Sequence, residues 1–400
     1  MHIALVRRQC SLKKAGAERY CVNLFRGLQR LGHRVTVIGE GIDDELKKEV
    51  EFLPVSVNAL TSWTKNRSFA ENCEKLVRSR RFDIVHGLSR VTGLDTYRLT
   101  DPMQTHWVKV WYRNPVSRWF QQLNPRHRAI FELERKLYRP TGVRRVIVQS
   151  KLDARLLVEY FGVDESRIRR IVNGVDTQVF CPQARIERAA VRVDLFRQFA
   201  AADCGNKLRP MSSSLTPDDT PLLVFASMDF RRKGLDTLLA ALAKVKERET
   251  RLLVLGAGDI ARYRRLAKFH GVANRVLFAG RQSSMERFYG AADLFVLPTI
   301  YEPFPNVNLE AMACGTPVIT TASAGGADLI EPGRNGFIIP DAWSVQALAE
   351  QIDHYLALPI SVKSKMSDAC WQIASKLRVE DNARQVVEVF EEVLREKNAA

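Results

Sequence analysis

Two carboxylates in the C-terminal half, Glu302 and Glu310, have the type and spacing suited to holding a sugar and a ribose beside a phosphate. They lie in the stretch Y-E-P-F-P-N-V-N-L-E-A-M-A-C-G-T-P-V, after an apolar strand that ends at Pro298. A helix is expected to begin at about 306–308, and the free N–H groups of a helix N-terminus stabilise phosphate. A carboxylate one turn into that helix can accept two hydrogen bonds from a vicinal diol. The alternative is that Glu302 is a solvated loop residue and that Glu310 is a favourable acid in the first turn of the helix.

Alternating strands and helices must position this stretch. Short apolar runs separated by helical patterns predict two doubly wound α/β domains, each with a parallel sheet. The expected strands are residues 2–6, 34–39, 82–87 and 144–150, then 222–227, 251–258, 275–280, 293–298 and 316–321. Between the two series, residues 181–221 are expected to form a linker or surface excursion, because much of this segment is rich in Pro, Ser, Asp and small residues.

The 301–318 stretch resembles the Glu-x7-Glu motif of the retaining glycosyltransferases of family 4, which have the GT-B fold. The matching residues are Glu302, Phe304, Glu310, Ala311, Met312, Ala313, Gly315 and Pro317. Further blocks in the family's order are Val172–Asp176, Leu253–Asp259, Ala324–Gly326 and Glu331–Phe337. The resemblance implies a GT-B fold, with two Rossmann-like doubly wound domains that face a cleft. Residues 1–172 plus about 379–400 would form the acceptor-binding domain, and residues 173–378 the nucleotide-sugar domain.

The resemblance also assigns donor-binding roles. Glu310 would hold the ribose hydroxyls and Glu302 the donor sugar. Backbone amides around Phe304, Asn306 and Val307 would contact the phosphates and the sugar. Upstream, Arg232 and Lys233 match the family's basic block that neutralises the pyrophosphate leaving group, although a solvated basic turn is the alternative. Gly16 corresponds to a glycine loop near the donor phosphates or the acceptor.

Within family 4 the chain is most similar to the lipopolysaccharide core glucosyltransferases. Ser227–Gly234 resembles their S-D-F-x-R-K-G block, and Gly93–Tyr97 followed by Asp101 resembles their G-L-D-x-Y block with a nearby aspartate. Asp101 would therefore lie at the reacting centre, where it polarises the acceptor hydroxyl or stabilises an oxocarbenium-like state. His106 is the rival for the role of general base. The alternatives are that Asp101 belongs to a turn at the end of a strand and that His106 is a structural histidine.

The positive charge is concentrated in the N-terminal half. The chain has a formal net charge of +16, and residues 1–150 hold 28 Lys and Arg against 14 Asp and Glu. Residues 107–145 interleave three tryptophans with ten basic residues and only two acidic ones. Interfacial aromatic and basic residues favour an anionic membrane surface. A helix with one core face and one solvated face remains the alternative, and no nucleic-acid-binding signature is evident.

Several classes of protein are disfavoured by the sequence. No apolar run of membrane-spanning length occurs, and the N-terminus runs straight into a strand without signal-peptide features. Seven scattered cysteines without a CxxC pair fit a reducing compartment better than a disulfide scaffold. We therefore expect a cytoplasmic protein, peripheral at the inner face of the cytoplasmic membrane.

These observations predict a retaining glycosyltransferase that moves a hexose, glucose from UDP-glucose, onto a lipid-linked glycan such as a lipopolysaccharide core. No cofactor or metal is expected, because Asp218-Asp219 lies in a polar excursion rather than in a suitable loop. One alternative is a nucleotide-binding oxidoreductase, for which 39–41 and 256–258 offer partial glycine turns. The other is a GT-B protein that binds sugar nucleotides without turnover.

Overall fold

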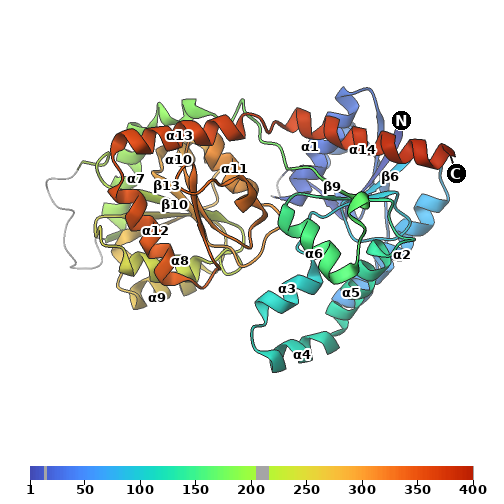
Figure 1. The fold of residues 1–400 in the computed structure, drawn as a ribbon, viewed down its shortest axis with the longest axis horizontal. Coiled ribbons are helices and arrows are strands. Elements are labelled where there is room, and N and C mark those ends of the chain that lie inside the picture. Colours follow the sequence, from blue (N-terminus) through green and yellow to red (C-terminus); the bar gives the residue numbers. More distant parts are fainter. Residues whose placement is uncertain (13–15, 204–215, 400) are drawn as a thin grey trace. The chain divides into compact units, whose positions relative to one another are not determined.

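The computed structural model describes residues 1–12, 16–203 and 216–399 of the 400-residue chain, which folds into two compact units (Figure 1). Unit 1 comprises Met1–Gly174, Glu302–Phe304 and Val379–Ala400, and unit 2 comprises Val175–Tyr301 and Pro305–Arg378. Within the described ranges, no helix combines the length and the apolar character that crossing a membrane requires.

Unit 1 is built on a seven-stranded sheet with the order β5-β3-β1-β6-β7-β8-β9, in which every neighbouring pair is parallel. Its strands are β1 (His2–Val6), β3 (Arg34–Gly39), β5 (Glu51–Pro54), β6 (Ile84–Gly87), β7 (Thr96–Arg98), β8 (Arg145–Val148) and β9 (Ile168–Arg170). Two short strands, β2 (Gln9–Cys10) and β4 (Gly41–Ile42), pair separately. The central strand β1 is almost wholly apolar and buried, as a strand covered on both faces must be.

Four helices pack close to this sheet: α1 (Ala17–Arg30), α2 (Ser62–Arg78), α6 (Lys151–Phe161) and the C-terminal α14 (Val379–Ala399). Helix α14 lies beside α1 (Figure 1), and its apolar side chains join the core formed by β1 and α1. The Tyr20 hydroxyl donates to Oδ1 of Asn382 at 2.9 Å. The end of the chain is therefore an integral part of unit 1.

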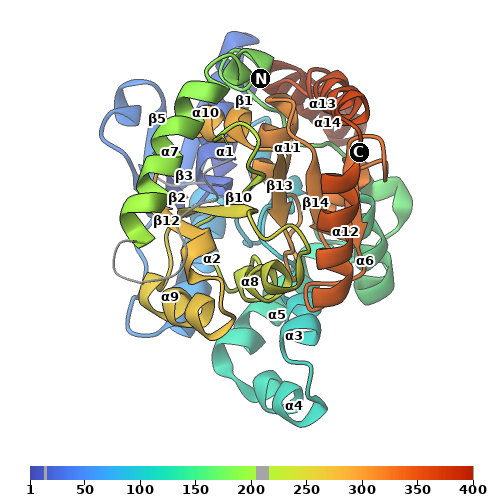
Figure 2. The same ribbon diagram turned by 90° about the vertical axis from the view of Figure 1, so that its left-hand side faces the viewer.

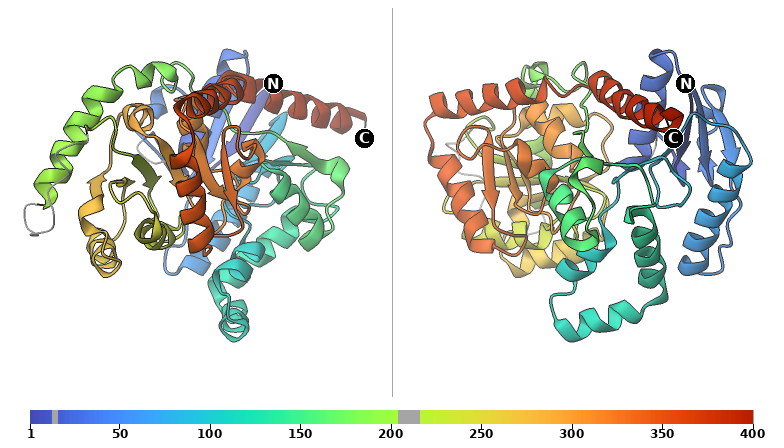
Figure 3. Two further views of the ribbon diagram at one scale, coloured as in Figure 1. Left: turned by 60° about the vertical axis from the view of Figure 1, so that its left-hand side comes forward. Right: turned by 45° about the vertical axis from the view of Figure 1, so that its right-hand side comes forward.

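Between β7 and β8 the chain forms a helical excursion of α3 (Gln104–Trp111), α4 (Pro115–Leu123) and α5 (Pro125–Tyr138). Asn114 and Asn124 cap α4 and α5, and a proline follows each cap at the first helical position. Helix α4 lies at the end of the excursion that is distant from the sheet of unit 1 (Figure 3). The basic and aromatic segment 107–145 thus coincides with this excursion.

Unit 2 holds a six-stranded parallel sheet with the order β12-β11-β10-β13-β14-β15. Its strands are β10 (Leu222–Ser227), β11 (Arg251–Gly256), β12 (Val276–Gly280), β13 (Leu294–Leu297), β14 (Val318–Thr321) and β15 (Gly336–Ile339). Its helices are α7 (Arg188–Asp203), α8 (Leu235–Lys244), α9 (Ile260–Phe269), α10 (Met285–Ala291), α11 (Asn306–Ala313), α12 (Val345–Ala357) and α13 (Ile360–Ala374). Helix α8 packs with α9 and α12, whereas α10 packs with α7 and α11 (Figure 2).

All the strands expected from the sequence are present, but the expected linker at 181–221 is partly wrong. Helix α7 occupies much of that segment. Its apolar residues Val191, Leu195, Phe196 and Phe199 are 2–4% exposed, so the helix is held by burial. Arg192 is also buried, and its Nη1 lies 3.2 Å from Oδ2 of Asp293. The composition of the stretch, rather than its apolar spacing, was misleading.

Candidate active site

The loops after β10 and β13 are bonded to each other at the carboxyl edge of the unit 2 sheet. The carbonyl of Arg232 accepts from the Ile300 amide at 3.0 Å and from the Thr299 hydroxyl at 3.3 Å. Gly234 has φ 81°, and a Cβ there would lie 2.0 Å from the Pro298 carbonyl oxygen. Only glycine permits this approach. The basic turn is thereby fixed against the loop that leads into α11.

The two basic residues of this turn differ in their surroundings. Lys233 is 7% exposed, whereas the Arg232 side chain is 24% exposed and its Nε lies 3.4 Å from Oδ2 of Asp229. Asp229 also accepts from the Arg232 amide at 3.1 Å, and its own amide donates to the Ser227 hydroxyl at 2.8 Å. These bonds give the turn a defined conformation. It presents cationic groups at the edge of the sheet where open α/β folds bind ligands.

Helix α11 begins at Asn306, as the sequence predicts. Pro305 occupies its N-cap, and a proline side chain cannot accept a hydrogen bond from the first-turn N–H groups. Asn306 and Val307 are half-buried in that first turn, and the preceding Phe304 is buried. A first turn without a capping side chain is suited to binding a phosphate oxygen.

Glu310 lies in the second turn of α11 and receives a hydrogen bond that the sequence did not reveal. The Tyr289 hydroxyl of α10 donates to its Oε2 at 3.2 Å. The Tyr289 ring is fully buried and packs edge-on against Phe295, with the ring centroids 5.5 Å apart. A rigid aromatic side chain therefore orients the carboxylate. Glu302 is half-buried in the loop between β13 and α11.

Most of the other residues in this motif serve the fold. Ala311, Met312 and Ala313 are all 0% exposed, so they pack α11 against its surroundings. Gly315 follows the helix with φ 74°, and a Cβ there would lie 2.6 Å from the Ser367 hydroxyl. It ends α11 in the left-handed conformation that favours glycine. The chemistry of the motif therefore rests on its two glutamates and on the N-terminus of the helix.

In unit 1, Asp101 belongs to a partly buried ionic network at the carboxyl ends of the strands, in which Arg7 is buried and the Asp101 side chain is 39% exposed. The Arg7 guanidinium, directly after β1, lies 3.1 Å from Oδ2 of Asp101 and 3.0 Å from Oε1 of Glu18. It also donates to the Leu88 carbonyl at 2.7 Å. Arg7 is 6% exposed, and Glu18 lies in the first turn of α1. Arg7 thus connects the start of α1 with the loop after β7.

This network decides the charge of Asp101. Burial by itself would raise the pKa of this carboxyl, but Arg7 and then Arg90 outweigh burial and lower the pKa below its usual value. Asp101 is therefore ionised throughout the physiological range. A carboxylate with a lowered pKa is a weak proton acceptor but a permanent negative charge.

His106 has a different partner. It lies in α3, and its Nδ1 is 3.2 Å from the Tyr160 hydroxyl of α6. Burial, and next Lys109, lowers the pKa of His106 to about 4, so the ring is neutral at pH 7. The structure therefore gives His106 a contact that joins two helices.

Gly16 is the N-cap of α1 and has φ 71° and ψ −126°, a backbone conformation that favours glycine. The residues immediately before it, 13–15, lie outside the described part of the chain. Its carbonyl accepts from the Tyr20 amide at 3.0 Å. Gly16 thus directs the chain from the first loop into α1, two residues before Glu18.

The glycines that suggested a dinucleotide turn have packing roles. A Cβ at Gly256 would lie 1.7 Å from the Ser227 carbonyl oxygen, and one at Gly39 would lie 2.2 Å from that of Arg7. A Cβ at Gly258 would lie 2.4 Å from the Phe230 ring. Close approach within the fold therefore accounts for these glycines.

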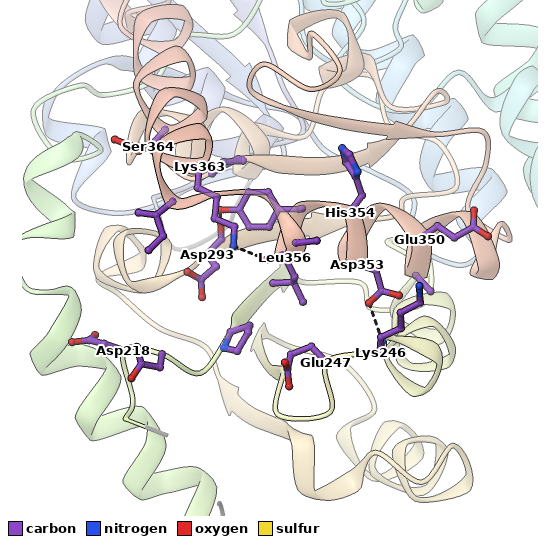
Figure 4. Close-up of a pocket in the computed structure, with 18 of the residues that line it drawn as sticks. Asp218, Lys246, Glu247, Asp293, Glu350, Asp353, His354, Leu356, Lys363 and Ser364 are labelled. Atoms are coloured by element: carbon purple, nitrogen blue, oxygen red, sulfur yellow. Dashed lines mark hydrogen bonds between the residues drawn. The ribbon is translucent and has the colours of Figure 1, made fainter. Parts of the chain in front are cut away.

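A cavity of about 1320 Å³ lies at the opposite, amino edge of the unit 2 sheet (Figure 4). Three of its lining residues, Pro221, Asp293 and Pro317, each directly precede a strand. Nη2 of Arg188 lies 2.5 Å from Oδ1 of Asp293, and Nζ of Lys363 donates to the Leu356 carbonyl at 2.7 Å. Both cations are therefore already bonded to other groups of the protein. Acidic residues line the cavity in numbers similar to the basic ones, which disfavours it as a diphosphate site.

Arg7, Glu18 and Tyr289 are the site residues that sequence reasoning missed. Arg7 had a signal in its position directly after a buried strand. Glu18 had one in its position two residues after the glycine that caps α1. Tyr289 gave no local signal, because its contact with Glu310 depends on how α10 packs against α11.

Comparison with known proteins agrees with these observations. Residues 15–179 match the model described as Glycosyltransferase Family 4, and residues 209–374 match the model described as Glycosyl transferases group 1. The lipopolysaccharide glucosyltransferase WaaG of Escherichia coli is 24% identical over 341 residues, which cover 84% of this chain and 84% of that protein.

Two solved structures illustrate the shared fold. A crystal structure of WaaG superimposes with a TM-score of 0.78 at 20% identity, and covers 97% of this chain and 99% of its own. Anabaena HepE in complex with UDP-glucose superimposes with a TM-score of 0.71 at 18% identity, and covers 98% of this chain and 100% of its own. The expected GT-B fold is confirmed, and the family matches favour a glycosyltransferase over an oxidoreductase. The chain belongs to the family 4 glycosyltransferases with the GT-B fold and is related to the lipopolysaccharide core glucosyltransferases.

Proposed function

We propose that this protein is a retaining hexosyltransferase that moves glucose from UDP-glucose onto a lipid-linked glycan such as a lipopolysaccharide core. The observation that carries the proposal is the position of Glu310. It lies on α11, whose N-terminus follows β13, and Tyr289 orients its carboxylate at 3.2 Å. A carboxylate fixed in this way accepts hydrogen bonds from the two ribose hydroxyls while the helix N-terminus binds phosphate.

The leaving nucleotide diphosphate gains negative charge as its bond to the sugar breaks. Arg232 and Lys233 supply positive charge, and the first turn of α11 around Asn306 and Val307 supplies N–H donors. Preorganised donors of this kind stabilise charge that develops in the transition state. They perform the task that a metal ion performs in other transferases, so we propose a metal-independent reaction. Phe304 and Glu302 would contact the donor sugar.

Asp101 would act through its charge. Its lowered pKa and its contact with Arg7 make it poor at taking a proton from an acceptor hydroxyl. A fixed negative charge near the anomeric carbon stabilises an oxocarbenium-like state. A proton released by the acceptor hydroxyl can then pass to the departing phosphate oxygen, which needs no basic side chain. Gly16 and Glu18 would support this region from the start of α1.

Helix α4 is proposed to hold the protein at a membrane surface, beside the lipid-linked acceptor. Its four apolar residues Val116, Trp119, Phe120 and Leu123 are 53–64% exposed, and none of its residues is buried. At 100° per residue these four share one face of the helix. Such a helix lies in the membrane–water interface, and nearby basic residues favour anionic lipid. This arrangement supports a peripheral protein at the cytoplasmic face of the membrane.

A panel of UDP-, GDP- and ADP-sugars tests the proposal, with hydrolysis and transfer to rough lipopolysaccharide as readouts. UDP-glucose should be turned over fastest, EDTA should leave the rate unchanged, and the anomeric configuration should be retained in the product by NMR. Inversion, a requirement for metal, or preference for another sugar would each contradict the corresponding part. Thermal stabilisation by NAD(P) and not by any sugar nucleotide would contradict the whole.

A further inference from the structure

The helical excursion of unit 1 borders a second, open cavity of about 950 Å³, which none of the functions above uses. Side chains from α2, α3, α4, α5 and α6 line it. Its basic residues are Arg67, Lys109, Arg118, Arg128 and Arg135, and its only acidic lining residue in the described part of the chain is Glu132. Trp63, Phe131 and Phe161 add aromatic surface. Convergent cations beside aromatic rings are suited to an anionic saccharide.

The positive charge of this cavity is only partly neutralised. Nε of Arg67 lies 2.7 Å from Oε1 of Glu71 and Nζ of Lys109 lies 3.7 Å from Oε1 of Glu159, whereas the other three lining cations have no acidic partner among the described residues. Nζ of Lys136, outside the lining, lies 2.8 Å from Oε1 of Glu132, so the one acidic group is already paired. Among the described residues, the Arg118 side chain donates only to neutral carbonyls, those of Tyr112 at 3.1 Å and Arg113 at 3.3 Å.

Two further arginines, both on α5, line the cavity. Arg128 and Arg135 are exposed and lie two turns apart on one face of α5, and their side chains make no ion pair or hydrogen bond within the described ranges. Arginine binds phosphate and carboxylate oxygens in a bidentate manner. The cavity therefore offers two uncompensated guanidinium groups to one ligand.

Helix α4 fixes the level of the cavity relative to the proposed membrane surface. Arg118 and Gln122 line the cavity, and at 100° per residue they lie on the side of α4 roughly opposite its exposed apolar face. With that face in the interface, the diameter of a helix, about 10 Å, separates the cavity from the acyl boundary. The polar headgroup region extends only about 5–8 Å beyond the acyl boundary, whereas a charged group on an extended glycan reaches the level of the cavity.

We propose that this cavity binds the phosphoryl groups of the glycan of the lipid-linked acceptor, with Arg128 and Arg135 as its principal ligands. The inference rests on the proposed function, because it assumes a lipid-linked glycan acceptor. It adds a charged recognition element that selects acceptors by their anionic substituents and orients them relative to α4.

Binding of an acyl-free probe tests the proposal. The probe is the oligosaccharide released from rough lipopolysaccharide by alkaline deacylation, compared with the same oligosaccharide after removal of its phosphates with aqueous HF. The Arg128→Gln/Arg135→Gln variant should bind the phosphorylated probe about 30-fold more weakly than the wild type, since two charge-assisted contacts are lost. Dephosphorylation should weaken wild-type binding and remove most of the difference between the two proteins.

The matched control is Arg126→Gln/Arg139→Gln, which removes the same charge from exposed residues at the two ends of α5 that do not line the cavity. It should change the affinity less than threefold, a limit set by long-range electrostatics. Equal weakening by both double variants would show a general charge effect and overturn the proposal. So would equal binding of the two oligosaccharides by the wild type.

Vesicles of phosphatidylcholine and phosphatidylglycerol separate lipid headgroups from the glycan as the source of the anion. The Arg128→Gln/Arg135→Gln variant and its control should bind these vesicles equally. Selective loss of vesicle binding with unchanged oligosaccharide binding would assign the cavity to headgroups and overturn the proposal. A wild-type protein that binds the oligosaccharide but turns over no sugar nucleotide would uphold the cavity and remove the proposed transferase function.

Discussion

The hydroxyl of Tyr289 donates to Oε2 of Glu310 at 3.2 Å, and this bond joins α10 to the carboxylate proposed to hold the ribose. Tyr289 is itself fixed, because its ring is buried and its carbonyl accepts from the Thr316 hydroxyl at 2.6 Å. Tyr289 is therefore a positioning residue. Its hydroxyl fixes the orientation of the Glu310 carboxylate.

Replacing Tyr289 with Phe should weaken donor binding roughly tenfold, because a hydrogen bond to a charged group contributes about 1.5 kcal/mol. UDP affinity from calorimetry and the KM for the donor measure this effect, and kcat should change less. Tyr263→Phe is the matched control. Tyr263 is a buried residue of α9, and its hydroxyl donates to Oδ2 of Asp236 on α8 at the same distance of 3.2 Å. If both variants bind UDP as the wild type does, Tyr289 has no positioning role.

The pairing of Arg7 with Asp101 predicts a change in the pH profile. Arg7 is the strongest of the cations that lower the pKa of Asp101, whereas burial acts in the opposite direction. Arg7→Gln should therefore raise the pKa of Asp101 and move the acid limb of the kcat profile to higher pH. Asp101→Asn should lower kcat about 100-fold, as removal of one electrostatic stabiliser does in other enzymes.

Glu18→Gln serves as the control for Arg7→Gln. It removes the other carboxylate bonded to Arg7 at 3.0 Å but leaves the contact between Arg7 and Asp101 in place. The acid limb of this variant should stay at the wild-type pH. If the limb stays in place in Arg7→Gln as well, then Asp101 does not need Arg7 to remain charged.

The sheets were predictable from the sequence because their strands are buried on both faces. Such strands appear as short, continuous apolar runs, and β1, β10 and β13 are clear examples. Among the strands that were missed, β5 and β9 lie at sheet edges and include charged or partly exposed residues, whereas the inner strand β7 is only three residues long and includes Thr96 and Arg98. Edge strands lack the pattern on which the prediction depends.

The site was predictable where residues adjacent in sequence act together. Glu310 and the start of α11 lie in one motif, and Arg232 and Lys233 in another. The ionic network of Arg7, Glu18 and Asp101 and the contact between Tyr289 and Glu310 join distant segments, so only the packing of the chain reveals them. The same holds for the cavity beside α4, whose lining comes from five helices.

Buried His86 predicts a loss of stability in mild acid. Its ring is 0% exposed, and burial, followed by Arg98, lowers its pKa to about 3 from the ordinary 6.5. The unfolded chain therefore takes up this proton first as the pH falls below about 6.5, while the folded chain resists it. Unit 1 should lose on the order of 2 kcal/mol of unfolding free energy between pH 8 and pH 5 from this group alone.

Urea unfolding of unit 1 at a series of pH values, followed by peptide-resolved hydrogen exchange, measures that loss. His86→Asn keeps a polar group near the Thr96 hydroxyl, which lies 2.8 Å from Nδ1 of His86. The variant should be less stable than the wild type at pH 8 but should lose less stability on acidification. Some dependence should remain from His106, whose pKa is also lowered, to about 4. A variant with the full wild-type dependence would show that His86 is not the group responsible.

Helix α4 predicts how the protein binds membranes. Trp119 and Phe120 are 56% and 58% exposed on its apolar face. Burying two such rings in the interface stabilises the bound state by about 2 kcal/mol, so Trp119→Ser/Phe120→Ser should lower vesicle partitioning about 30-fold. The control is Phe269→Ser, because this phenylalanine is 82% exposed at the end of α9 in unit 2. Co-sedimentation with vesicles of phosphatidylcholine and phosphatidylglycerol should separate the two variants, and raising the salt should weaken the wild type, since exposed charges are screened. If vesicle binding is unchanged by the α4 substitutions and does not depend on anionic lipid, the membrane contact lies elsewhere on the protein.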